Sequence, residues 1–366
     1  MQNIKRKLID LKNTVTRHDI LLSIVIAISL IAVGTFMGWY NNKVVPVNPL
    51  PLAHYSLEKS NPLSFMSDWD GPNYINIAKH GYPQVSLANF FPLYPIFIRL
   101  FKLVINSWLD SALLVAWVSL VGAVYFYLKI VKQLFNVKDS PEAVRGLVFF
   151  LLFPSAVFLI ATYTESLFAF LALGAIYFAL KRKYLPAGLF ALFCTATHIT
   201  GIFVLVLMTL ILLEQKLKLS KVITAFVVGS LGLVGYMIFL WEKFRKPLAF
   251  ITSQENHGWL KYGESRLITT IDLFNVIFII LLIISVLYWW RKRKSFSVYS
   301  FLFLLIPIIG KQFGGYNRYV LMAFPVQLML YAYLRDKKLG YVFAIVLLAI
   351  SWSYFLFQYA GGYIGG

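Results

Sequence analysis

The chain has 366 residues, of which 60% are hydrophobic and only 13% are charged. A soluble domain cannot bury so much apolar surface, so this composition argues against a water-soluble protein and predicts one that crosses a membrane several times. The formal net charge of +19 does not indicate a nucleic-acid partner, because 22 of the 34 Lys and Arg residues gather at the ends of alternate apolar runs, as in loops that stay in the cytoplasm.

Apolar runs of about the length that crosses a bilayer recur along the chain. The first run is too long for the core of a signal peptide, and no small-residue cleavage site follows it, so we expect a retained anchor. With two further apolar segments, 91–106 and 185–213, the pattern predicts an all-α polytopic protein of about nine to eleven membrane helices. The nine predicted spans are residues 20–40, 109–130, 146–162, 166–181, 222–241, 268–290, 296–311, 319–334 and 340–360.

The longest predicted exported loop follows the first span. With the basic segment 1–19 in the cytoplasm, residues 41–108 lie outside. Pro72 suits the first turn of a short helix over about 72–80. Prolines and basic residues interrupt segment 91–106, so we expect a helix lying at the membrane interface. A full crossing would turn the next basic loop outward, against the charge rule.

Residues 185–213 lie between two basic turns, 181–183 and 216–221, so this segment must return to the side from which it starts. Polar residues from Thr195 to Gly201 interrupt it midway. We therefore predict two short helices that meet at a polar tip covered by protein. One long tilted span with a polar centre is the alternative. The absence of evident internal repeats predicts a single membrane domain over residues 1–366.

The polar motifs all fall on the exported side under this topology. Carboxylates, histidines, amides and an arginine would converge there, which predicts a catalytic cavity at the membrane surface. The segments are Asp68-Trp69-Asp70, Tyr163-Thr164-Glu165-Ser166, Thr195–Gly201, 247–259 and Gly314-Gly315-Tyr316-Asn317-Arg318-Tyr319.

Asp70 is the candidate general base, accepting a proton from an acceptor hydroxyl as a new bond forms. Its position before Pro72 equally suits a helix cap. Asp68 stands two residues away, where its side chain points in a different direction, so we expect it to be solvated or to order the loop.

Three other residues carry two interpretations each. Glu165 either orients the acceptor or stabilises the start of a helix. His198 binds a phosphate or a sugar hydroxyl, or makes structural hydrogen bonds at a helix break. Arg318 clamps a lipid-linked phosphate, or extends to the membrane interface with its apolar stem covered.

The other candidates would line a substrate cavity. No metal centre, divalent cation or other cofactor is expected, and the single cysteine, Cys194, allows neither an intramolecular disulfide nor a thiolate site. The lining candidates are Asp68, Trp69, Tyr74, Tyr163, Glu165, Gln254 and His257.

Several short blocks follow one another in a characteristic order. They are Trp69-Asp70, Ile77-Ala78-Lys79-His80-Gly81-Tyr82, Phe90-Phe91-Pro92-Leu93-Tyr94-Pro95, Phe153-Pro154-Ser155-Ala156, Tyr163-Thr164-Glu165-Ser166-Leu167-Phe168, Ala187-Gly188-Leu189, Pro247-Leu248-Ala249-Phe250, Arg318-Tyr319 and Phe324-Pro325. In these blocks, over residues 65–330, the chain resembles the PIG-V family of mannosyltransferases, within the GT-C class of membrane glycosyltransferases. The first blocks are the most specific.

The resemblance implies transfer of a hexose, mannose in most relatives, from a polyprenyl-phosphate carrier to an acceptor on the extracytoplasmic face. The essential aspartate of GT-C enzymes corresponds to Asp70, and we expect an inverting, metal-independent reaction in which Arg318 and His198 bind the donor phosphate. Many relatives have an arginine near the position of His198, which leaves its role and the choice of substrate open. The acceptor would be a glycolipid, a polymer or a protein. The chain looks compact beside eukaryotic members, which favours a prokaryotic plasma membrane.

Two other classes of protein stay open at this point. A transporter or flippase of a lipid-linked or sugar substrate would place ionisable groups at the membrane midplane, between related repeats. A structural or assembly subunit would need the same polar residues only for complex formation.

Overall fold

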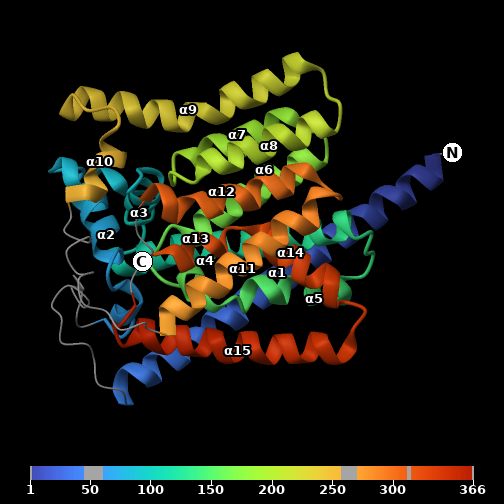
Figure 1. Ribbon diagram of the computed structural model, residues 1–366, viewed down its shortest axis with the longest axis horizontal. Coiled ribbons are helices and arrows are strands. Elements are labelled where there is room, and N and C mark those ends of the chain that lie inside the picture. Colours follow the sequence, from blue (N-terminus) through green and yellow to red (C-terminus); the bar gives the residue numbers. More distant parts are fainter. Residues whose placement is uncertain (1, 45–60, 257–269, 311–314, 365–366) are drawn as a thin grey trace.

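The computed structural model describes residues 2–44, 61–256, 270–310 and 315–364. Every regular element in these ranges is a helix, so the predicted all-α fold is confirmed. The long helices run along one common direction, and the turns between them gather at two opposite ends of the molecule (Figure 1).

Five helices are long and apolar enough to cross a membrane. They confirm long apolar helices at the predicted spans 20–40, 109–130, 222–241 and 340–360, and over the described part, 270–290, of the predicted 268–290. These helices are α1 (Gln2–Val44), α4 (Trp108–Leu134), α9 (Leu219–Phe244), α11 (Thr270–Trp290) and α15 (Lys338–Ala360). Helix α4 is the most buried of them and packs against α1, α3, α5 and α6.

Five shorter apolar helices complete the bundle. The exact number of crossings therefore stays a prediction. These helices are α6 (Glu165–Leu180), α7 (Tyr184–Thr195), α8 (Gly201–Glu214), α12 (Lys294–Gly310) and α14 (Phe324–Leu334).

Two predicted spans, 146–162 and 319–334, are wrong as continuous helices. The first divides into α5 (Ser140–Leu151) and the 3₁₀ helix η3 (Pro154–Leu159), and the second into α13 (Tyr316–Leu321) and α14. Proline cannot donate the backbone hydrogen bond that continues a helix. Pro325 leaves the carbonyl of Leu321 without its helical donor, and the side chain of Gln327 donates to that carbonyl instead, at 3.1 Å.

The segment 185–213 is a hairpin, as predicted, and the alternative of one tilted span is wrong. Helices α7 and α8 run in opposite directions and pack against each other (Figure 1). A Cβ atom at Gly201 would lie 2.7 Å from the carbonyl oxygen of Cys194, so only glycine lets the chain close this tightly at the tip. Helix α9 covers α7 at similarly close range, because a Cβ at Gly232 would lie 2.0 Å from the carbonyl oxygen of Leu192.

The first large loop contains four short helices within its described part. The predicted helix at 72–80 is confirmed as α2, whereas α3 covers only nine residues of the predicted 91–106. Nine residues span only about 14 Å, so α3 is too short to cross a bilayer. The loop helices are η1 (Ser64–Ser67), α2 (Gly71–His80), η2 (Val85–Asn89) and α3 (Leu93–Phe101).

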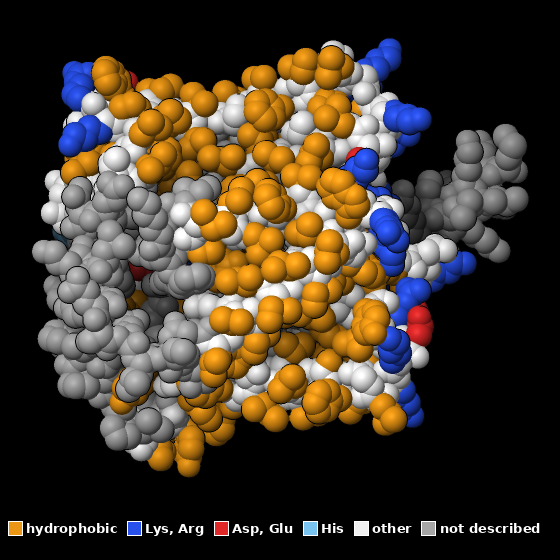
Figure 2. All heavy atoms as spheres, viewed as in Figure 1, with side chains coloured by type: hydrophobic (Ala, Val, Ile, Leu, Met, Phe, Trp, Pro, Cys, Tyr) orange, Lys and Arg blue, Asp and Glu red, His pale blue; other side chains and the backbone are white. Residues whose placement is uncertain are grey.

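Charge divides the molecule into two ends. In Figure 2 the Lys and Arg side chains gather along one end, here called the basic end, and a smaller group lies where α9 finishes at the other. The basic end contains the turns at 181–183, 215–218, 291–293 and 335–337 (Figure 1). The predicted grouping of the basic turns is therefore found in the structure. The assignment of that end to the cytoplasm stays a prediction.

Candidate active site

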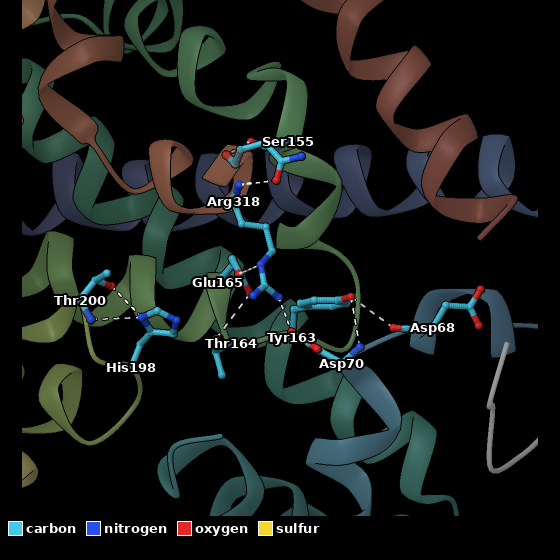
Figure 3. A network of polar contacts seen from close by, with 10 residues as sticks. Asp68, Asp70, Ser155, Tyr163, Thr164, Glu165, His198, Thr200 and Arg318 are labelled. Atoms are coloured by element: carbon cyan, nitrogen blue, oxygen red, sulfur yellow. Dashed lines mark hydrogen bonds and ion pairs between the residues drawn. The ribbon is translucent and has the colours of Figure 1, made fainter. Parts of the chain in front are cut away.

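Three charged side chains from distant parts of the sequence meet at the end opposite the basic end (Figure 3). Nη1 of Arg318 lies 2.7 Å from Oδ2 of Asp70, and Nε of Arg318 lies 3.3 Å from Oε1 of Glu165. Only 8% of Asp70, 6% of Glu165 and 7% of Arg318 is exposed. The predicted convergence of these residues is therefore present as a buried ion-pair network, here called the carboxylate–arginine cluster.

Each member of the cluster stands at the start of a helix. Asp70 immediately precedes α2, Glu165 is the first residue of α6, and Arg318 lies in the first turn of α13. The partial positive charge of a helix N-terminus stabilises both carboxylates. The side chain of Asp70 makes no capping hydrogen bond to α2 and is directed to Arg318 instead. The capping interpretation of Asp70 is therefore wrong.

The backbone around Asp70 is held in a strained shape by Tyr163. Trp69 has a φ of 59°, in the left-handed region that costs a bulky residue about 1–3 kcal/mol. The Tyr163 hydroxyl donates to the carbonyl of Asp68 at 3.3 Å and accepts from the amide of Asp70 at 3.4 Å. One phenol thus bridges the two peptide groups on either side of the strained residue and fixes the direction of Asp70.

Gly71 permits this loop to press against the segment before α6. A Cβ atom at position 71 would lie 2.2 Å from Oγ1 of Thr162 and 2.7 Å from Oγ of Ser67. The amide of Thr162 and the hydroxyl of Tyr359 both donate to the carbonyl of Met66, at 2.9 and 3.1 Å. The glycine that follows Asp70 therefore allows the close packing of this loop.

Arg318 is enclosed by aromatic rings. Its guanidinium carbon lies 5.1 Å from the ring centre of Tyr163, 5.7 Å from that of Phe158 and 5.9 Å from that of Tyr319. Such contacts favour a cation. An arginine in this setting is not extended to the interface, so that interpretation of Arg318 is wrong.

Sequence reasoning named neither Asn317 nor Ser155 as a site residue, although both belong to quoted motifs. Oδ1 of Asn317 accepts from the amide of Arg318 at 2.6 Å, and the carbonyl of Asn317 accepts from the hydroxyl of Ser155 at 2.8 Å. These bonds fix the start of α13 against η3. The feature of the sequence that could have identified Asn317 and Ser155 is their position inside these motifs.

Asp68 is buried, so the expectation that it is solvated is wrong, whereas its role in ordering the loop stays a prediction. Its exposed fraction is 1%, and burial raises the pKa of its carboxyl to about 8. In Figure 3 its carboxylate points away from Arg318. The adjacent aspartates thus have different surroundings, and only Asp70 belongs to the carboxylate–arginine cluster.

His198 lies in the turn between α7 and α8, beside the cluster. Its Nδ1 accepts from the amide of Thr200 at 3.2 Å, and its ring centre lies 5.4 Å from that of Tyr319. Burial and the charge of Arg318 lower the pKa of His198 to about 3, so the ring is neutral at pH 7. A neutral ring whose Nδ1 accepts carries its proton on Nε2 and can donate from that atom.

A lining role for the other candidate residues stays a prediction. Tyr74 is buried on α2, with its ring edge-on to Phe90 and Tyr94 at 5.0 and 5.3 Å between ring centres. The predictions for the side chain of Gln254 and for His257 lie outside the described residues.

The sequence model described as mannosyltransferase (PIG-V) matches residues 21–240, more than half of the chain. The chain belongs to the PIG-V mannosyltransferase family. A search of curated proteins gave no match. This member of the PIG-V family is therefore a glycosyltransferase, and its apolar helices make it a multi-pass membrane protein. Asp70, Glu165 and His198 lie inside the matched region, whereas Arg318 lies beyond it.

Proposed function

We propose that this PIG-V family member transfers mannose from a polyprenyl-phosphate carrier to a hydroxyl group, with inversion and with Asp70 as general base. The observation that carries the proposal is the buried ion pair between Asp70 and Arg318, at the end of the molecule opposite the basic turns. There a mostly buried carboxylate is held in a fixed direction, which suits a positioned catalytic base.

The proposed reaction needs one proton acceptor. The bond between the sugar and the carrier phosphate breaks, the phosphate leaves with the electron pair, and the acceptor oxygen forms a bond on the opposite face of the sugar. The ion pair with Arg318 uses Oδ2 of Asp70, and a carboxylate offers a second oxygen to the acceptor hydroxyl. Asp70 would take the proton of that hydroxyl.

Arg318 and His198 would receive the donor phosphate. The contact of Arg318 with Glu165, at 3.3 Å, is longer than its contact with Asp70, at 2.7 Å, so an incoming phosphate oxygen would displace Glu165 first. His198 would add a neutral donor through Nε2. Glu165 would then be free to orient the acceptor, and Asp70 would keep its partner.

The proposed setting follows from the distribution of charge. If the basic end lies in the cytoplasm, the carboxylate–arginine cluster faces outward, where a prokaryotic plasma membrane would present the lipid-linked donor. The acceptor would be a glycolipid, a wall polymer or an exported protein. The membrane would assist catalysis by holding the phosphate of the donor at a fixed depth.

The test is transfer of radiolabelled mannose from polyprenyl-phosphate mannose by the purified protein in proteoliposomes. Asp70→Asn should abolish transfer and leave the melting temperature within a few degrees of the wild type. Asp139→Asn is the matched control, because Asp139 is exposed at the basic end and makes no capping hydrogen bond. Near-normal turnover by Asp70→Asn would remove Asp70 from the base role. Movement of the labelled lipid across the bilayer without a covalent product would favour a flippase.

A further inference from the structure

A cavity of about 360 Å³ lies at the basic end, far from the carboxylate–arginine cluster. It is bounded by Glu214, the last residue of α8, and by the turn between α11 and α12. That turn, together with the last residue of α11 and the first residue of α12, supplies one aromatic and four cationic residues in succession. They are Trp290, Arg291, Lys292, Arg293 and Lys294.

The one carboxylate of this cavity is already engaged. Glu214 accepts from the amide of Ser295 at 2.6 Å through Oε1, and from the hydroxyl of Ser295 at 2.8 Å through Oε2. It therefore caps the start of α12, where the helix N-terminus also favours negative charge. The lining contains four cations and one carboxylate, Glu214, which is already hydrogen-bonded to Ser295. The cavity therefore has an excess of positive charge.

Arg293 has a buried donor that this carboxylate does not satisfy. Its Nη1 is buried and has no hydrogen-bond partner among the described residues. Burial also lowers the pKa of Arg293, which means that the folded protein solvates this cation less well than water does. An oxygen-rich anion would satisfy the buried donor and balance the charge.

The rim of the cavity suits a membrane–water interface. Trp290 is 57% exposed, Nζ of Lys294 lies 5.8 Å from its ring centre, and Nζ of Lys292 lies 3.8 Å from that of Tyr288. Exposed aromatic rings beside lysines are typical of the headgroup level of a bilayer. We propose that this cavity binds the phosphate of an anionic phospholipid headgroup, from the leaflet at the basic end. The site is separate from the proposed reaction and does not depend on it.

The experiment is native mass spectrometry of the full-length protein in a neutral detergent, titrated with phosphatidylglycerol or phosphatidylcholine. The wild type should retain one phosphatidylglycerol in preference to phosphatidylcholine. The double variant Arg291→Gln/Lys292→Gln, in which both altered residues are exposed, should bind it about 30-fold more weakly. Lys294→Gln should weaken it about fivefold, which provides a second test if the double variant melts early.

The matched control is Arg182→Gln/Lys183→Gln. It removes two exposed cations from another turn at the same end, which does not line this cavity. If both double variants bind phosphatidylglycerol equally weakly, the effect arises from general surface charge, and the proposal is overturned. Equal retention of the two lipids by the wild type would also overturn it. If inorganic phosphate at the same concentration as the lipid displaces phosphatidylglycerol, the cavity is a site for free phosphate and not for a lipid headgroup, and the proposal is overturned.

Discussion

Two buried ion-pair clusters lie at opposite ends of the molecule and differ in their charge balance. In the carboxylate–arginine cluster, two carboxylates share one guanidinium. At the basic end, Asp19 of α1 contacts Lys129 at 2.5 Å and Lys132 at 2.6 Å, both on α4. There one carboxylate has two cations, one at each of its oxygens, and Ser140 also donates to it at 3.2 Å.

The two clusters also differ in construction. The lysines beside Asp19 stand three residues apart on one uninterrupted helix, where neighbours share a face. Asp70 and Arg318 come from a loop with a left-handed tryptophan and from a helix of six residues. The Asp19 cluster joins two long helices, whereas the carboxylate–arginine cluster fixes the direction of the loop carboxylate that we propose as the general base.

The largest expected contrast is in catalysis. Asp70→Asn should lower kcat by about 10²–10⁴-fold, because it removes the proposed proton acceptor. Asp19→Asn should keep kcat within about twofold and lower the melting temperature, because it removes the carboxylate that both lysines share. Single-turnover transfer and thermal melting of both variants measure the contrast. A similar loss of kcat in the two would contradict it.

Removal of a cation should affect stability unequally at the two ends. Arg318→Gln leaves two buried carboxylates without a partner and should destabilise the protein by about 3–5 kcal/mol. Lys132→Gln leaves Asp19 paired with Lys129, so its cost should be about 1 kcal/mol or less. Melting in detergent compares the two variants. Equal melting temperatures would show that Arg318 is not needed to balance the carboxylates.

Tyr163→Phe should lower kcat by about tenfold and leave KM nearly unchanged, because only the direction of Asp70 is lost. Tyr94→Phe is the control, since Tyr94 is also a fully buried tyrosine, but its hydroxyl donates to the carbonyl of Ala112 on α4 and not to the Asp70 loop. Full steady-state kinetics separate the two parameters. If Tyr94→Phe lowers kcat as much, Tyr163 has no special role in positioning.

The smallest effect concerns pH. The pKa of Asp68 is raised to about 8, so between about pH 4 and 8 the folded state binds a proton that the unfolded state has lost. This group therefore lowers stability as the pH rises through that window. In Asp68→Asn the fall in melting temperature from pH 5 to pH 8 should be smaller than in the wild type. An unchanged slope would mean that Asp68 is ionised in the folded protein.

Apolar length and charge placement were enough to predict the long helices, the hairpin and the grouping of polar motifs at one end. The two broken spans were missed because both segments stay apolar across the break, and the breaks fall beside Pro154 and Pro325. Pairing between Asp70 and Arg318, 248 positions apart, has no local signature. The burial of Asp68 also depends on segments that fold against it from elsewhere in the chain.

That separation of 248 positions has a consequence for the order of synthesis. Both carboxylates are made before the arginine, and a ribosome must complete about nine-tenths of the chain before the cation exists. A nascent or prematurely terminated polypeptide therefore carries the acidic half of the site alone. The carboxylate–arginine cluster is therefore complete only once α13 has been made and has packed against η3.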